Sequence, residues 1–118
     1  MSEPPTTILH ITTESGWAQA QAAGELRPPS LAEEGFIHCS TAQQVEATAN
    51  RIFSGSGDLL LLVVDPSRLN APLKWERATD VAAEFPHIYG ALNLGAVVDH
   101  VALPEGADGY VLPPALRG

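Results

Sequence analysis

A histidine, a thiol and two hydroxyls occupy four consecutive positions in the segment Gly35-Phe36-Ile37-His38-Cys39-Ser40-Thr41. The segment lies where a short apolar strand is predicted to lead into a helix. The ends of strands display functional side chains because the scaffold there is rigid and the side chains are accessible. An imidazole changes its charge nearer to neutral pH than other side chains do. We therefore predict that His38 lies at a cleft wall and moves a proton, the alternative being a half-buried structural histidine.

The residues that follow His38 have structural as well as functional interpretations. Hydroxyls at the start of a helix accept hydrogen bonds from unpaired amides, and Thr41 with Gln44 matches a capping box. The same helix start could hold a phosphate or a carboxylate, so we predict that Ser40 and Thr41 bind a ligand. In a strand Cys39 points to the opposite face from His38, and we interpret it as a small buried hydrophobic residue.

A second segment with chemical potential is Phe85-Pro86-His87-Ile88-Tyr89-Gly90, in which His87 and Tyr89 face the same way if the backbone is extended. An imidazole beside a phenol suits the orientation of a polar ligand or general acid–base catalysis. A structural Tyr–His hydrogen bond is the alternative. Glu76 could supply a carboxylate to this site, although a glutamate in an edge strand is more often solvated. The predicted catalytic residues are His38, His87 and Tyr89.

A third histidine, His10, lies in the predicted strand 8–12, either on the face opposite the main core or projecting into a cleft. Three imidazoles plus water form a known catalytic zinc set, but no HxH, HxxxH or CxxC spacing supports one here. We therefore predict no metal ligands. The chain also has no Gly-x-Ser-x-Gly motif and no glycine-rich phosphate loop, which argues against those two classes of enzyme. The predicted ligand-binding residues are His10, Ser40, Thr41 and Glu76.

Two main helices are predicted from hydrophobic periodicity and capping residues. Residues 14–23 are expected to be helical between a threonine N-cap and a stop at Gly24. A second helix is expected to run from Thr41 to about residue 53. Residues 28–30, Pro-Pro-Ser, are predicted to form a loop because consecutive prolines remove backbone donors. The predicted buried stripe of the second helix is Val45, Ala49, Ile52 and Phe53.

The strand pattern determines the predicted fold class. Residues 58–65 form a continuous apolar run bounded by acids, which predicts a central strand that is buried on both faces. Residues 73–77 mix charged and apolar side chains and predict an edge strand. Helices come early and strands late, so we predict an α+β domain with a small mixed or antiparallel sheet. The other predicted strands are 8–12, 36–39, 97–103 and 110–112, with 85–89 as a loop or short strand.

Composition limits the class of protein. The 118 residues predict one domain over residues 7–118 after a disordered lead-in at 1–6. A net charge of −8 without a Lys/Arg cluster argues against nucleic acid as a partner. One cysteine, no signal-peptide pattern and a longest apolar run of residues 59–64 predict a soluble cytoplasmic protein that does not enter a membrane. We expect a small-molecule partner, and the oligomeric state is left open.

Three motifs resemble a bacterial family known as domain of unknown function 952, over residues 7 to 103. They are Ile8-Leu9-His10-Ile11, the segment Glu34 to Thr41 with Gln44, and the segment Phe85 to Gly90. Ala91 departs from the proline that the family typically carries there, which we expect to change a turn and not the chemistry. The resemblance implies membership of the ADP-ribosyltransferase-like superfamily, and hence a split sheet with a cleft for an NAD-like ligand.

In that superfamily a first-strand histidine or arginine holds a ribose, and a later Ser-Thr pair shapes the pocket. The resemblance therefore implies that His10 and the pair Ser40-Thr41 have these roles. The late catalytic glutamate of the superfamily has no match, and His87 and Tyr89 lie in that region instead. The residues identify no cofactor, whereas the resemblance implies an NAD-like or ADP-ribose-like ligand.

Three functional hypotheses follow from the sequence. The first is a transferase or hydrolase that acts on a nucleotide ligand in a cleft lined by histidine, serine, threonine and tyrosine. The second is a non-catalytic module that binds a small metabolite in the same pocket. In the third, all the histidines are structural. The sequence leaves open the substrate and the choice between transfer and hydrolysis.

Overall fold

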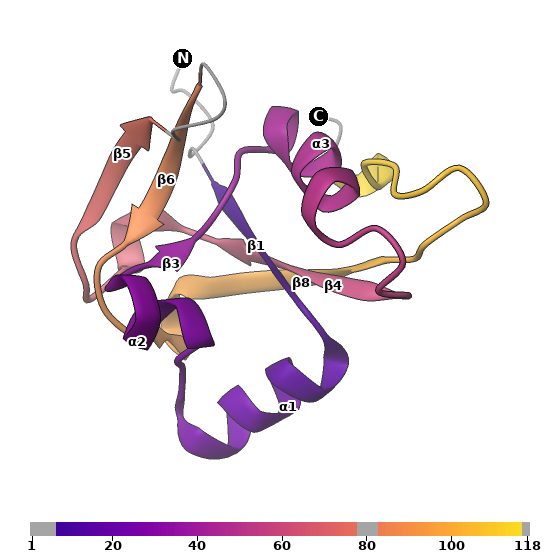
Figure 1. Cartoon of the computed structure of the whole chain (residues 1–118). Coiled ribbons are helices and arrows are strands. Elements are labelled where there is room, and N and C mark those ends of the chain that lie inside the picture. The colour runs from indigo at the N-terminus through magenta and orange to yellow at the C-terminus, as the bar shows by residue number, and fades with distance from the viewer. Residues whose placement is uncertain (1–6, 78–82, 117–118) are drawn as a thin grey trace, which may run out of the picture.

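The centre of the fold is strand β4 (Leu59–Val64), six apolar residues that are all buried. In this computed structural model, which describes residues 7–77 and 83–116, β4 lies between β1 (Ile8–Thr12) and β8 (Val97–Leu103). It is antiparallel to both neighbours (Figure 1). The predicted central strand is therefore confirmed, with the flanking acids just outside it.

Both faces of β4 are covered, because its side chains alternate between two hydrophobic clusters. The first cluster takes Leu60, Leu62 and Val64. The second takes Leu59, Leu61 and Val63, together with Val45 and Ala49 from helix α3 (Ala42–Ile52). On the first face, Ile8 of β1 joins the core, so His10 shares a face with core residues and is not opposite the core. This corrects one of the two placements expected for His10.

A second, smaller sheet lies beside the main one and contains both predicted chemical segments (Figure 1). It consists of β3 (Ile37–His38), β6 (Glu84–Ile88) and β5 (Leu73–Arg77), paired antiparallel in that order. The predicted edge strand β5 is confirmed, with the expected bounds. The chain after β3 joins β1 of the main sheet, because Leu9 and Ser40 exchange two backbone hydrogen bonds of 2.7 and 2.8 Å. The two sheets therefore meet at Leu9 and Ser40, next to His10.

The two predicted helices form where capping residues allow them. Helix α1 (Glu14–Ala23) begins after Thr13, whose hydroxyl accepts from the Gly16 amide, and it ends at Gly24 in the left-handed region with φ 89°. Helix α3 begins after Thr41, whose amide donates to the side-chain carbonyl of Gln44 at 3.0 Å. Ile52 was expected in the buried stripe of α3, but it is 58% exposed.

A third helix, α2 (Pro29–Glu34), replaces the loop that the prolines predicted. Proline is tolerated in the first turn of a helix, since the amide it lacks would have no partner there. At the end of α2, Gly35 takes a φ of 91°, which favours glycine, and turns the chain into β3. Two short strands, β2 (Glu25–Leu26) and β7 (Leu92–Asn93), also pair antiparallel.

The predicted α+β class is confirmed, with one correction: there are three helices in the described ranges and not two. Of the two alternatives for the sheet, mixed or antiparallel, the second holds, because every strand pair there is antiparallel. Residues 110–112 form no strand, since the backbone amide of Tyr110 donates instead to Oδ1 of Asn50 and its carbonyl accepts from Nδ2 of the same side chain. The disordered lead-in predicted for residues 1–6 falls outside the described residues.

The helices that the structure describes are too short or too polar to traverse a bilayer. Three short 3₁₀ turns complete the fold: Pro66–Arg68, Leu94–Ala96 and Pro114–Leu116.

Candidate functional site

One face of the small sheet carries an unusual density of polar and aromatic side chains. His38 of β3 lies directly opposite His87 of β6, which lies opposite Lys74 of β5. Because side chains alternate along a strand, Glu76 and Tyr89 share this face with them. The rings of His38 and His87 lie 5.3 Å apart between their centres. The sheet thus brings both predicted chemical segments together.

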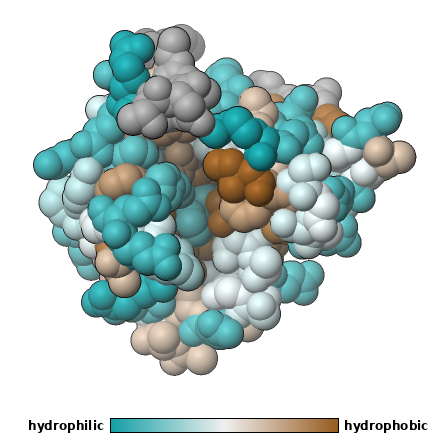
Figure 2. Space-filling model, in the orientation of Figure 1, coloured by the Kyte–Doolittle hydropathy of each residue, from teal (hydrophilic) through white to brown (hydrophobic). Residues whose placement is uncertain are grey.

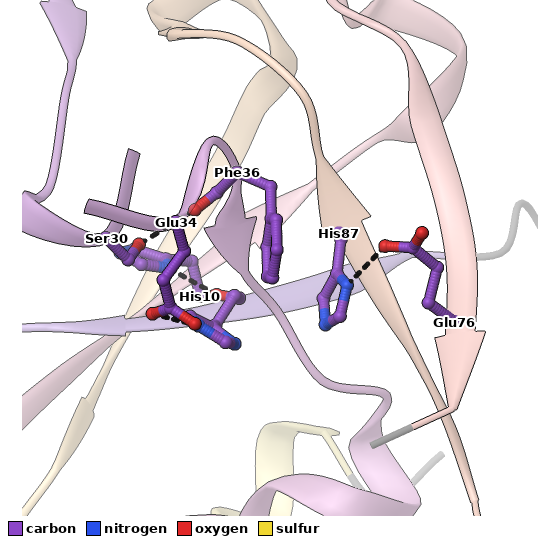
Figure 3. A network of polar contacts seen from close by, with 7 residues as sticks. His10, Ser30, Glu34, Phe36, Glu76 and His87 are labelled. Atoms are coloured by element: carbon purple, nitrogen blue, oxygen red, sulfur yellow. Dashed lines mark hydrogen bonds and ion pairs between the residues drawn. The ribbon is translucent and has the colours of Figure 1, made fainter. Parts of the chain in front are cut away.

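Glu76 organises this polar face. One of its carboxylate oxygens accepts a hydrogen bond of 2.8 Å from Nδ1–H of His87 (Figure 3). The same oxygen accepts a hydrogen bond of 2.6 Å from the Tyr89 hydroxyl. These hydrogen bonds, first that of Tyr89 and then that of His87, hold the pKa of Glu76 below its usual range. The same carboxylate raises the pKa of Tyr89. His87 and Tyr89 are therefore linked through Glu76 and not by the direct bond considered from the sequence.

Phe36 fixes the ring of His87 from its other side. The two rings are stacked, with centres 4.1 Å apart and planes inclined by 18°, and Figure 3 shows His87 between Phe36 and Glu76. Phe36 also contacts the edge of His38, with ring centres 4.9 Å apart. Phe36 was not among the predicted site residues, although its position two residues before His38 places both side chains on one face of an extended chain.

His10 is buried, with only 7% of its surface exposed, and is held by the chain at β3. Its Nδ1–H donates to the backbone carbonyl of His38 at 2.8 Å. Burial lowers the pKa of His10, while that hydrogen bond opposes the shift. His10 is therefore kept neutral, in the tautomer that carries its proton on Nδ1.

His38 differs from the other two histidines because its side chain is 53% exposed. Its Nε2–H donates to the Glu34 carboxylate at 2.9 Å, an interaction that the sequence prediction missed even though the two residues are four apart. An exposed pair of this kind contributes little to stability. The proton-transfer role of His38 remains a prediction.

A cleft of about 930 Å³ lies between the two sheets and the end of α3. This volume is at the upper end of the range for small-molecule sites, about 300–1,000 Å³. Four of the seven predicted site residues line it, while Glu76 and Tyr89 support His87 from beside it and Thr41 caps α3. The four lining residues are His10, His38, Ser40 and His87.

Two imidazole nitrogens open into this cleft. His10 and His87 each use Nδ1 for a hydrogen bond, and neither Nε2 has a partner among the described residues. In the described ranges, every fully buried side-chain nitrogen or oxygen has a hydrogen-bond partner. Because these two Nε2 atoms have none, they are not fully buried and are accessible to solvent. Since both residues line the cleft, each presents an acceptor lone pair to a bound molecule when its ring is neutral.

Neither a metal centre nor an activated thiol emerges from this arrangement. Within residues 7–77 and 83–116, no three His, Cys, Asp or Glu side chains are grouped so that they could hold a metal ion. Cys39 is buried, as predicted, and burial raises the pKa of its thiol far above the ordinary value. Among the described residues, the cleft therefore presents imidazole nitrogens as hydrogen-bonding groups, and their part in proton transfer remains a prediction.

Fold and site together define a small α+β protein with a histidine-lined cleft. The chain belongs to the family described as "Protein of unknown function (DUF952)", whose family model matches residues 11–100. The family predicted from the sequence motifs is thus confirmed. No curated protein matches the chain.

Solved structures of one bacterial protein share the fold. The crystal structure of protein CC0527 from Caulobacter crescentus is 35% identical in sequence, with a TM-score of 0.80 over 89% of this chain and 92% of that one. A double mutant of CC0527 gives 34% identity and a TM-score of 0.80 over 89% and 92% of the two chains. The solution NMR structure of CC0527 gives 34% identity and a TM-score of 0.75 over 88% and 90% of the two chains.

Proposed function

We propose that this chain is a small enzyme, a transferase or hydrolase, that binds a hydroxyl-bearing nucleotide ligand of the NAD or ADP-ribose type in the cleft. One observation carries the proposal: two buried imidazoles direct their free Nε2 atoms into the same cleft, and a carboxylate holds one of them. Both are acceptors in their neutral form, so they match a ligand that presents hydroxyl or amino groups. A ribose carries such hydroxyl groups on adjacent ring carbons.

His87 is the base in this proposal. Glu76 accepts its Nδ1–H at 2.8 Å, which selects the tautomer whose Nε2 can take a proton from a ligand hydroxyl or a water molecule. The positive ring that results is stabilised by the adjacent carboxylate. Phe36 stacks on the ring and prevents it from rotating away. Glu76 is thus a positioning residue, since it acts through His87.

His10 and Ser40 position the ligand. Nε2 of His10 accepts a hydrogen bond from a ligand hydroxyl, which is the role that the family resemblance implies for a first-strand histidine. Ser40 is buried at 3% exposure, lines the cleft next to His10 and exchanges backbone hydrogen bonds with Leu9. The ligand therefore reaches the point where the two sheets meet.

A second candidate is a binding module without catalysis, and one observation favours it. The thiol that lines the cleft, Cys39, is buried with a raised pKa, so it is no nucleophile. A reaction here would need direct attack by water or by a second substrate on the bound ligand. A module that senses the same ligand would need only the two acceptor nitrogens.

The test is to incubate the protein with NAD or ADP-ribose and to separate the products by chromatography. We expect His87→Gln and Glu76→Gln to lower the turnover rate by about 10²–10⁴-fold, the usual contribution of a positioned acid or base. The matched control is His100→Gln, because His100 is exposed and lies outside the cleft lining. Turnover that survives both His87→Gln and Glu76→Gln would overturn the proposed catalysis. Binding without turnover in the wild type would favour the module.

A further inference from the structure

The side chain of Ile52 is exposed where its position in the sequence predicts burial. Ile52 ends α3 and, at 58% exposure, is the most exposed large hydrophobic residue described. Its spacing continues the stripe of Val45 and Ala49, which are fully buried. The stripe is uncovered at Ile52 because the cleft begins there.

Ile52 is part of a larger apolar wall. Phe53 and Ile11 line the cleft beside it and pack from behind against the second hydrophobic cluster, which fixes their positions. Phe85 of β6, two residues from His87, lines the cleft as well. Figure 2 shows hydrophobic surface gathered at the centre of the hollowed face, over the region of α3 in Figure 1.

We propose that Ile52, Phe53 and Phe85 form an apolar subsite for a ring-sized group of the ligand. The cleft is amphipathic, since the imidazoles of His10 and His87 lie in the same space as this wall. A purely polar ligand would leave the apolar wall hydrated. A ligand with an apolar ring would cover the wall and remove both the ring and the wall from water. The apolar subsite is inferred from the wall itself. That the rest of the ligand carries hydroxyl groups is part of the proposed function, and the inference rests on the proposed function in that respect only. In a nucleotide, the base is the group that this subsite accepts.

The first experiment probes the subsite without any nucleotide. Anilinonaphthalene sulfonate, whose fluorescence rises on apolar surfaces, is titrated into the folded protein. We expect Ile52→Asn to weaken its binding by about fivefold to tenfold, because the variant removes one apolar side chain from the wall. The matched controls are Val98→Asn and Val111→Asn, which replace exposed valines outside the cleft lining. Thermal unfolding verifies that Ile52→Asn folds, as expected for an exposed position.

The second experiment compares adenosine monophosphate with ribose phosphate by calorimetry. We expect the wild type to bind the nucleotide about tenfold or more tightly, the scale of a base on an apolar platform. Ile52→Asn should bring the two affinities together, whereas His87→Gln should weaken both.

Each outcome decides between the two proposals. Dye binding or a nucleotide preference that is unchanged in Ile52→Asn would overturn the subsite, whatever becomes of the catalysis. If the dye depends on Ile52 and neither phosphate compound binds, the apolar subsite stands and the nucleotide function falls.

Discussion

The two three-stranded sheets of this protein use the same antiparallel pairing for different purposes. In the main sheet, all six residues of β4 are apolar and buried, and their side chains fill two cores. In the small sheet, one face brings together His38, His87, Glu76 and Tyr89, and β5 remains at an exposed edge. The central strand of the main sheet is shielded from water on both faces, whereas the small sheet holds polar groups at the border of a cleft.

The comparison shows how a small protein can bury polar side chains without a large loss of stability. Buried polar groups cost free energy unless they are hydrogen-bonded. His87 and His10 meet that condition at Nδ1, with Glu76 and the His38 carbonyl as acceptors. What they leave unbonded is only the nitrogen that faces the cleft. The core supplies the stability that allows this arrangement to persist.

The largest expected effect is on the core. Leu61→Ala removes a fully buried side chain from the second cluster, away from the cleft. We expect the free energy of unfolding to fall by about 2–5 kcal/mol, as for other large-to-small core substitutions. Denaturant titration measures this loss. Ile52→Ala is the control, because an exposed site should change stability by only about 0.5 kcal/mol or less. Equal losses in both variants would contradict the described packing.

The second prediction concerns His10 and pH. Its pKa is depressed below the ordinary 6.5 by burial, so below that pH the unfolded chain takes up a proton that the folded chain does not. Stability from this source is present above pH 6.5 and is lost as the pH falls through the folded pKa. We expect His10→Gln to flatten the decline in unfolding free energy on acidification below pH 6.5. His100→Gln should keep the wild-type slope, and loss of the slope in that control would contradict the assignment.

The third prediction concerns Tyr89, which supports the site without lining the cleft. Its hydroxyl is the main cause of the lowered pKa of Glu76, so Tyr89→Phe should raise that pKa. The carboxylate would then be protonated at a higher pH, and the acid side of a pH–activity or pH–binding profile should move upward. We expect a smaller loss at neutral pH than for His87→Gln. An unchanged acid side would mean that Glu76 does not act through its charge.

The smallest expected effect is at Cys39. Because the thiol is buried and its pKa is raised, a thiol reagent should leave the folded protein unmodified at neutral pH and react only after denaturation. The absorbance of the leaving group that the reagent releases measures the reaction. Rapid modification of the native protein would contradict the burial of Cys39.

Much of the fold could be predicted because its signals are local. The apolar run of β4, the caps at Thr13 and Thr41 and the edge character of β5 all lie within a few residues of sequence. Helix α2 was missed because two prolines indicated a loop, although Pro29 is compatible with a first turn. The local patterns therefore failed where one residue type permits two structures.

The site could be predicted only in part, because its contacts are long-range. The alternation of His87 and Tyr89 was visible in the sequence, and Glu76 was considered as their carboxylate. One Glu76 oxygen accepts hydrogen bonds from both residues, and this arrangement depends on the pairing of β5 with β6. The contact of His10 with His38 depends on the junction between the two sheets. Ile52 was placed in the core because helical spacing does not reveal where a cleft begins.

The most direct test of the central claim is thermal unfolding of the wild type, His87→Gln and His100→Gln with and without ADP-ribose. A ligand at about a hundred times its dissociation constant adds about 2.7 kcal/mol of stability. For a domain of this size the midpoint should rise by roughly ten degrees. We predict this rise in the wild type and in His100→Gln, and its loss in His87→Gln. An equal rise in all three proteins, or none in the wild type, would contradict a ligand site on the polar face of the small sheet.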